Sequence, residues 1–190
     1  FFIIYYLIYS KILFEYLFLC NLMFIVGFLD DLKIKISPSK RLVLMIIFLF
    51  ALIYSIPIKI LNIDIPFINI LLNNEIFSSL FVLFCFLFII NGANLIDGFN
   101  GLLSINLIII NSILSYINLN SGNIEFTIFI IGQIIILLSF LLFNFPKAKI
   151  FLGDSGAYLF GSLTALNVII TNNLNPVSYT HLTLPTKRIV

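Results

Sequence analysis

Four aspartates in this chain have surroundings that suit cation and phosphate binding. Asp30 and Asp31 are adjacent, Asp97 lies in the stretch NGANLIDGFNG at 91–101, and Asp154 lies in the stretch GDSG. Adjacent carboxylates repel each other, and a divalent cation, a lysine or a shared proton could relieve that repulsion. Carboxylate, amide and phosphate oxygens are the hard ligands that Mg²⁺ prefers. These residues are therefore candidates for a site that holds Mg²⁺ and phosphate.

Glycines accompany these acids and allow a second interpretation. Glycine lets the backbone bend at a helix end and approach a ligand closely, and exposed N–H groups there suit phosphate. Glycines also pack membrane helices together. Asp97 and Asp154 each lie near the predicted start of an apolar segment, where a carboxylate can cap a helix. Both interpretations remain open for any single residue. The glycines concerned are Gly92, Gly98, Gly101, Gly153 and Gly156.

The composition places these residues in a membrane protein. Of the 190 residues, 62% are hydrophobic and 9% are charged, and the mean hydropathy is +1.20. A soluble domain of this length carries about a quarter of charged residues and could not bury so much Phe and Ile. We therefore predict an all-α fold, a polytopic transmembrane helical bundle formed by residues 1–175. The chain starts without Met inside an apolar run, so we expect its reading frame to begin upstream.

About six spans are predicted, because a membrane helix needs roughly 20 apolar residues. Residues 1–9 resemble the tail of a further span, and Pro38 interrupts the polar connector at 31–41. Residues 59–74 contain Asn, Pro and Ile and are predicted to form a loop, with a short hairpin as an alternative. The spans are predicted at 16–29, 42–58, 76–90, 102–117, 126–145 and 157–171.

The order of these spans places all four aspartates on one membrane face, because even numbers of crossings separate them. A carboxylate at the bilayer centre costs about 2.5–3.5 kcal/mol, so these acids are expected at span ends, near water and a cation. An excess of Lys and Arg marks the cytoplasmic side. The predicted face is therefore cytoplasmic, and four acids gathered there favour a functional site over helix capping. Its basic residues are Lys33, Lys35, Lys40, Arg41, Lys147 and Lys149.

The last residues do not fit this pattern. The segment PVSYTHLTLPTKRIV at 176–190 is polar and resembles a translated adapter or cloning tail. We predict that it is not native protein and exclude it from the fold. Its His181, the only histidine of the chain, is excluded from the site with it.

Three motifs, each after a predicted span, resemble one enzyme family. GFLDD at 27–31, NGANLIDGFNGL at 91–102 and FNFPKAKIFLGDSGAYLFG at 143–161 are similar to the motifs of the polyprenyl-phosphate N-acetylhexosamine-1-phosphate transferases, glycosyltransferase family 4. The GDSGAYLFG form resembles the glycan-initiating, undecaprenyl-phosphate GlcNAc-1-phosphate transferase branch more than the peptidoglycan branch. The family has additional spans before the first motif and a basic, His-containing loop near its end that reads the sugar. Neither matches here, so the resemblance implies a fragment that lacks the first and last parts of the family fold.

The resemblance also implies a reaction. A membrane polyprenyl phosphate attacks the β-phosphate of a UDP-N-acetylhexosamine, UMP leaves, and a polyprenyl-diphosphate sugar remains. The family requires Mg²⁺, with Mn²⁺ as an alternative. This step initiates cell-envelope glycan synthesis at the cytoplasmic face of the inner membrane. The implied partners are these two substrates and the membrane, with no nucleic acid, and a homo-oligomer is left open.

Nine residues receive roles from the resemblance. Asp154 would be the main metal ligand, with Asn94 as a second. Asp30 and Asp31 would lie beside the acceptor phosphate as catalytic residues, one of them proposed as a base. The remaining five would bind substrate: Asp97 and Asn100 the nucleotide, Phe151 the uracil by stacking, Lys40 the pyrophosphate, and Asn91 a part of the substrate that is not specified.

Two other classes of protein fit part of the sequence. A secondary transporter also uses acids in broken helices to bind ions, but its acids lie near mid-membrane and its halves repeat. Here the acids gather at one face and the sequence shows no internal repeat. The second alternative is a catalytically silent membrane scaffold that has kept the fold.

Overall fold

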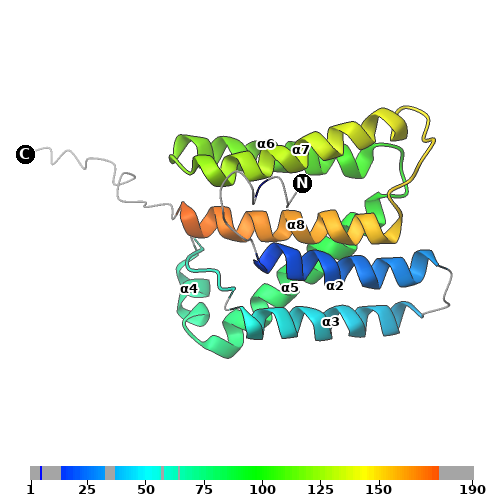
Figure 1. Cartoon of the computed structure of the whole chain (residues 1–190). Helices are drawn as coiled ribbons and strands as arrows, with labels where there is room; N and C mark the ends of the chain where they lie inside the picture. Colours follow the sequence, from blue (N-terminus) through cyan, green and yellow to red (C-terminus); the bar gives the residue numbers. More distant parts are fainter. Residues whose placement is uncertain (1–4, 6–13, 33–36, 57, 64, 176–190) are drawn as a thin grey trace, which may run out of the picture.

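The computed structural model describes residues 5, 14–32, 37–56, 58–63 and 65–175, and all the regular structure within them is helical. This confirms the predicted all-α fold (Figure 1). The predictions for residues 1–9 (Tyr5 apart), Lys33, Lys35 and the segment 176–190 with His181 lie outside the described residues. The helices are α2 (Phe14–Asp31), α3 (Pro38–Ser55), α4 (Pro66–Leu72), α5 (Glu75–Ile96), α6 (Leu102–Asn120), α7 (Ile124–Asn144) and α8 (Gly153–Leu174).

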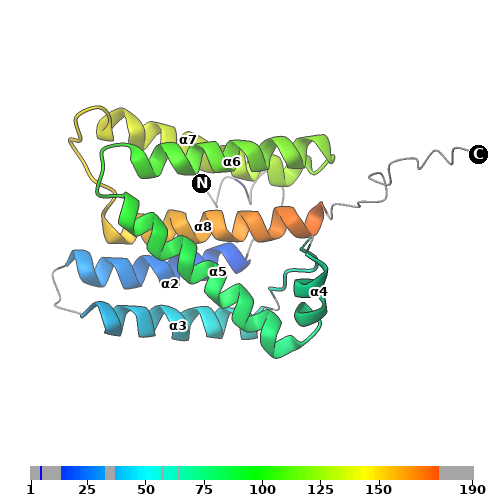
Figure 2. The ribbon, with the colours of Figure 1, turned by 180° about the vertical axis from the view of Figure 1, so that it is seen from behind.

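Six of these helices are long, and four of them, α3, α5, α6 and α7, are apolar enough to cross a membrane. The other two long helices, α2 and α8, differ because of the residues that they contain. Helix α2 carries three acids, and α8 is rich in Ser, Thr, Asn and Gly. Helix α8 nevertheless runs through the middle of the bundle and packs against α2, α5 and α6 (Figures 1 and 2). A helix that is enclosed by other helices can carry polar residues within a membrane, because it does not need an apolar surface all round. The chain is therefore a multi-pass membrane bundle.

The segment 59–74 corrects the prediction of a loop or hairpin, because it contains helix α4. Pro66 stands at the first helical position, where its fixed φ favours helix formation. The side chain of Asn69 accepts a hydrogen bond from the N–H of Ile63 at 2.8 Å and so ties the preceding residues to the helix. Asn74 then caps α5 by accepting from the N–H groups of two residues in its first turn. The hydrogen bonds of these two asparagines therefore stabilise the residues on either side of the short helix α4.

A cluster of amide side chains holds α8 in place within the apolar core. The buried Asn167 accepts a hydrogen bond from the hydroxyl of Tyr16 on α2, at 2.6 Å. Its own amide nitrogen donates to Asn111 on α6 and to Gln133 on α7, each at 2.8 Å. Gln133 is thus an interhelical hydrogen-bonding residue. Because polar groups within a bilayer must be satisfied by protein, this cluster fixes the position of α8 against three neighbouring helices.

Helices α2 and α8 approach closely at Gly27, one turn before the acidic end of α2. A Cβ atom at this position would overlap the backbone of Ser155 in the first turn of α8. Gly27→Ala is therefore expected to push the two helices apart and to destabilise the protein by about 1–3 kcal/mol. The measurement is the thermal unfolding temperature of the detergent-purified chain.

Gly92→Ala provides a matched control for this prediction. Gly92 also lies inside a long helix, α5, but no atom lies within 4 Å of the position that its Cβ would take. Alanine favours helix over glycine by up to about 1 kcal/mol, so this variant is expected to be as stable as the parent or more stable. Equal unfolding temperatures for the two variants would show that close packing at Gly27 does not matter.

Candidate functional site

The four predicted aspartates lie at one end of the bundle. Asp30 and Asp31 end α2, Asp97 follows α5 directly, and Asp154 lies in the first turn of α8. The α2–α3 and α7–α8 connections are at this same end (Figures 1 and 2). The predicted convergence of the three motifs is therefore confirmed.

Arg41, in the first turn of α3, joins two of these acids. Its guanidinium donates hydrogen bonds to Oδ2 of Asp30, at 2.7 Å, and to Oδ2 of Asp154. The Arg41 side chain is only 17% exposed. One cation thus connects the ends of α2, α3 and α8 at the edge of the bundle.

The sequence favours Lys40 rather than Arg41 as the basic residue of the site. Lys40 is exposed, and among the residues that the structure describes no ion pair joins it to an acid. In the structure Arg41 shares a helical face with the buried residues Met45 and Leu49, which directs it toward the bundle and Lys40 away from it. The sequence does not show this distinction, because the equally apolar Leu44 and Phe48 follow Lys40 at the same spacing. The contact of Lys40 with pyrophosphate stays a prediction.

Asp31 has a structural partner at the start of α8. Its carboxylate accepts hydrogen bonds from the backbone N–H of Asp154, at 3.1 Å, and of Ser155, at 3.0 Å. Gly153 precedes them with φ +71°, a conformation that favours glycine, and a Cβ there would lie 3.0 Å from the Asp31 carboxylate. Two of the free N–H groups expected to suit phosphate are therefore occupied by Asp31.

Asp97 lies at the C-terminal end of α5, which corrects the prediction that it lies near the start of a helix. The helix continues through Asn91 and Asn94 to Ile96, and the next helix, α6, begins only after Gly101. Burial raises the pKa of Asp97 to about 6; the Gly153 N–H lowers it and the charge of Asp31 raises it. Asp97 is thus a half-buried carboxyl beside the start of α8.

The aspartates of this cluster carry more negative charge than the guanidinium that they share can neutralise. Burial raises the pKa of Asp154 to about 6, with the neighbouring Asp30 adding to the effect, and the guanidinium of Arg41 lowers it only in part. A raised carboxyl pKa means that the fold disfavours the charged form. Among the described residues, Arg41 is the cation that is ion-paired at this end. A further cation near Asp154 would relieve this imbalance.

The remaining predicted residues surround the cluster. Asn94 donates a hydrogen bond to the hydroxyl of Tyr158 at 3.3 Å, and Asn91 bonds to its own helix at Leu87. Asn91 also lines a groove of about 380 Å³ on α5. Asn100 and Phe151 are exposed on the two loops beside the aspartates, and Phe151 is 63% exposed. An exposed aromatic side chain here is free to stack on a planar ligand.

Asn144 is a further residue that the sequence leaves unassigned to the site. Its amide oxygen accepts from the N–H of Gly101, and its amide nitrogen donates to the carbonyl of Ile150 at 2.8 Å. Asn100 adds a bond to the carbonyl of Pro146 at 3.2 Å. These bonds fasten the loop after Asp97 to the loop before Asp154. Asn144, at the end of α7, therefore connects these two loops.

Two side chains of this site carry oxygen atoms of the kind that Mg²⁺ binds as part of its coordination sphere. Among the described residues, no three His, Cys, Asp or Glu side chains are grouped so as to hold a metal alone. Mg²⁺ in proteins is commonly held by one or two carboxylates together with substrate phosphates and water. Asp154 and the amide oxygen of Asn94 are hard donors of this kind, and Tyr158 adjoins both. The donor set therefore suits a cation that substrate helps to bind.

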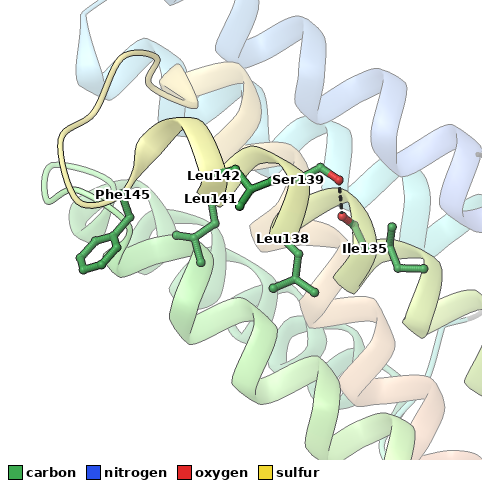
Figure 3. Close-up of a pocket in the computed structure, with 6 residues that line it drawn as sticks. All are labelled: Ile135, Leu138, Ser139, Leu141, Leu142 and Phe145. Atoms are coloured by element: carbon green, nitrogen blue, oxygen red, sulfur yellow. Dashed lines mark hydrogen bonds between the residues drawn. The ribbon is translucent and has the colours of Figure 1, made fainter.

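A separate groove of about 410 Å³ lies on α7, away from the acids (Figure 3). It is lined almost entirely by apolar side chains, and its one hydroxyl, of Ser139, donates to the carbonyl of Ile135 at 2.8 Å. It contains none of the predicted site residues, and its apolar lining suits contact with lipid tails.

The fold and the site together define a class of protein, a multi-pass membrane bundle with an acid-rich site at one end. The family model described as "Glycosyl transferase family 4" matches residues 13–172, which is most of the chain. The chain therefore belongs to glycosyl transferase family 4, as its motifs predict.

The relatives found among curated proteins are longer than this chain. The "Phospho-N-acetylmuramoyl-pentapeptide-transferase" of Clostridium perfringens (strain 13 / Type A) is 35% identical over 154 residues, which cover 76% of this chain and 48% of the relative. The protein of that name from Listeria monocytogenes serovar 1/2a is 34% identical over 155 residues, covering 76% and 48%. The chain spans about half the length of these relatives. Their name specifies N-acetylmuramoyl-pentapeptide, so it does not support the predicted similarity to the GlcNAc-1-phosphate transferase branch.

Proposed function

We propose that this chain is the catalytic bundle of an enzyme that transfers a sugar 1-phosphate from a UDP-N-acetylhexosamine to a membrane polyprenyl phosphate, releasing UMP. The observation that supports the proposal most strongly is the meeting of Asp30, Asp154 and Arg41 at one end of a membrane bundle of this family. A site at the membrane edge can receive a lipid phosphate from the bilayer and a nucleotide from water. The relatives' name suggests an N-acetylmuramoyl-pentapeptide as one form of the sugar.

Asp154 and Asn94 are the residues that would hold Mg²⁺, with Mn²⁺ as the alternative. When bound, the cation would neutralise the charge of the diphosphate that is being cleaved. Arg41 would contribute a second positive charge beside it, from the same cluster. Phosphoryl transfer depends mainly on positioning and charge neutralisation, which is what such an arrangement supplies.

The two adjacent aspartates would have different tasks. Asp31 holds the start of α8 through two backbone N–H groups, so it would position Asp154. Among the described residues no backbone N–H donates to Asp30, which would lie beside the acceptor phosphate, where Arg41 orients it. A phosphate monoester loses its second proton near pH 6, so most of the acceptor is a dianion at pH 7. Asp30 would therefore contribute more by orientation than by removing a proton.

The nucleotide would occupy the loops beside the aspartates. Phe151 would stack on uracil, and Asp97 with Asn100 would hold the nucleotide, while Asn91 lines the groove that leads along α5. We propose that this end faces the cytoplasm at the inner membrane, because the predicted loops of this face carry most of the basic residues. UDP-sugars would reach it there.

The experiment that tests the function is an assay of UMP release from UDP-N-acetylglucosamine and from UDP-N-acetylmuramoyl-pentapeptide by the purified chain in lipid nanodiscs. Release that requires both polyprenyl phosphate and Mg²⁺ is expected with one of these donors. A secondary transporter would instead move ions or solute across vesicles without cleaving either donor. No release with either donor and full binding of polyprenyl phosphate would favour the silent scaffold.

A further inference from the structure

Tyr158 contacts the candidate metal site and has no role in the proposed function. It follows Asp154 by one turn of α8, and its side chain is buried, with 2% of the residue exposed. Its hydroxyl accepts a hydrogen bond from Nδ2 of Asn94 on α5, at 3.3 Å. The hydroxyl also lies within electrostatic range of the guanidinium of Arg41 on α3 and of the Asp154 carboxyl. One phenol oxygen therefore lies near groups from two other helices beside Asp154.

The hydrogen bond determines which end of the Asn94 amide is available. The nitrogen of a side-chain amide is a donor and does not bind cations, whereas the oxygen is a hard acceptor. Because Tyr158 engages the nitrogen, the oxygen remains for a cation. Without this partner the amide could rotate, and its two ends would exchange places.

We propose that Tyr158 is a positioning residue for the metal site, whose hydroxyl orients the amide of Asn94 so that Asn94 and Asp154 bind one divalent cation. The proposal rests on the proposed function, because it requires a cation at these two residues. Partners that orient metal ligands in this way commonly change metal affinity by about 10–100-fold when they are removed.

A purely structural role is the alternative for a buried tyrosine. A phenol that is buried needs a hydrogen-bond partner whether or not a ligand is near. This chain contains such a case at the other side of the bundle, where the hydroxyl of Tyr16 donates to Asn167 at 2.6 Å. Tyr16 is fully buried and also pairs with an asparagine, so Tyr16→Phe is a matched control for Tyr158→Phe.

The test measures Mn²⁺ binding by the full chain in detergent, from the electron paramagnetic resonance signal of free Mn²⁺, together with thermal unfolding. Tyr158→Phe is expected to weaken Mn²⁺ binding about tenfold, because the ring is kept and only the orienting oxygen is lost. Tyr16→Phe is expected to lower the unfolding temperature and leave the Mn²⁺ affinity unchanged. Asn94→Ala is expected to weaken Mn²⁺ binding as well, and adding Tyr158→Phe to it should have no further effect.

The outcomes separate this inference from the proposed function. Binding by the parent chain that is lost in Asp154→Asn would support the proposed metal site. Given that result, parent-like Mn²⁺ affinity in Tyr158→Phe would overturn the positioning role of Tyr158. Equal weakening in the single and double variants would support it, whereas additive weakening would show that Tyr158 does not act through Asn94. No Mn²⁺ binding by the parent chain, either alone or with UDP-N-acetylglucosamine present, would overturn both the metal site and the inference.

Discussion

Asp154→Asn is expected to reduce the rate of UMP release by about 10²–10³-fold, which corresponds to about 3–4 kcal/mol of activation free energy. The amide has the shape of the carboxylate and keeps an oxygen that can accept from Arg41, so the change removes mainly charge. That charge is what the proposed cation would bind next to the diphosphate. The measurement is the steady-state rate at saturating Mg²⁺ and substrates in nanodiscs.

The same variant is expected to remain folded, which distinguishes this loss from unfolding. The pKa of Asp154 is raised to about 6, so ionisation of this carboxyl is less favourable in the fold than in the unfolded chain, and removing the charge offsets the weaker bond to Arg41. Its unfolding temperature should stay close to that of the parent. Glu75→Gln is the control, because Glu75 is an exposed carboxylate paired with Lys59 outside the aspartate cluster. A parent-like rate for Asp154→Asn would remove Asp154 from the metal site.

The helices and the convergence of the acids could be predicted from the sequence because both follow from one-dimensional patterns. Apolar runs of about 20 residues define membrane helices, and the parity of the crossings then decides which connectors share a face. The sequence placed Asp30, Asp97 and Asp154 together on this basis alone, and the structure agrees. Membership of the family follows from the same three motifs.

The different roles of the aspartates in the cluster could not be predicted from the sequence, because these roles depend on contacts between helices. Nothing in the sequence distinguishes Asp30 from Asp31, yet one pairs with Arg41 and the other caps α8. The link that Asn144 makes between two loops likewise requires three segments in their folded positions. The burial of Arg41 likewise becomes visible only in the structure, because the helix that follows Lys40 and Arg41 is apolar on every side in the sequence.

Arg41→Gln is the substitution that decides whether this arginine acts in transfer or only holds the acids together. It removes the cation shared by Asp30 and Asp154, and the two carboxylates are left to repel each other. Without divalent cations the variant is expected to lose about 1.5–3 kcal/mol of stability, the range for hydrogen bonds to charged groups. Adding Mg²⁺ should restore much of this loss, because the cation can take the place of the guanidinium between the carboxylates.

At saturating Mg²⁺ the rate of transfer by Arg41→Gln should nevertheless remain about 10²-fold below that of the parent, because one positive charge beside the diphosphate is gone. Mn²⁺ affinity is expected to be unchanged or tighter, since Arg41 competes with the cation for Asp154. This pattern differs from that of Asp154→Asn, in which rate and affinity fall together. Lys59→Gln, which breaks an ion pair with Glu75 away from the aspartates, serves as the control and should change neither quantity. A parent-like rate in Arg41→Gln, together with a large loss of rate in Lys40→Gln, would show that Lys40 and not Arg41 is the basic residue that acts in transfer.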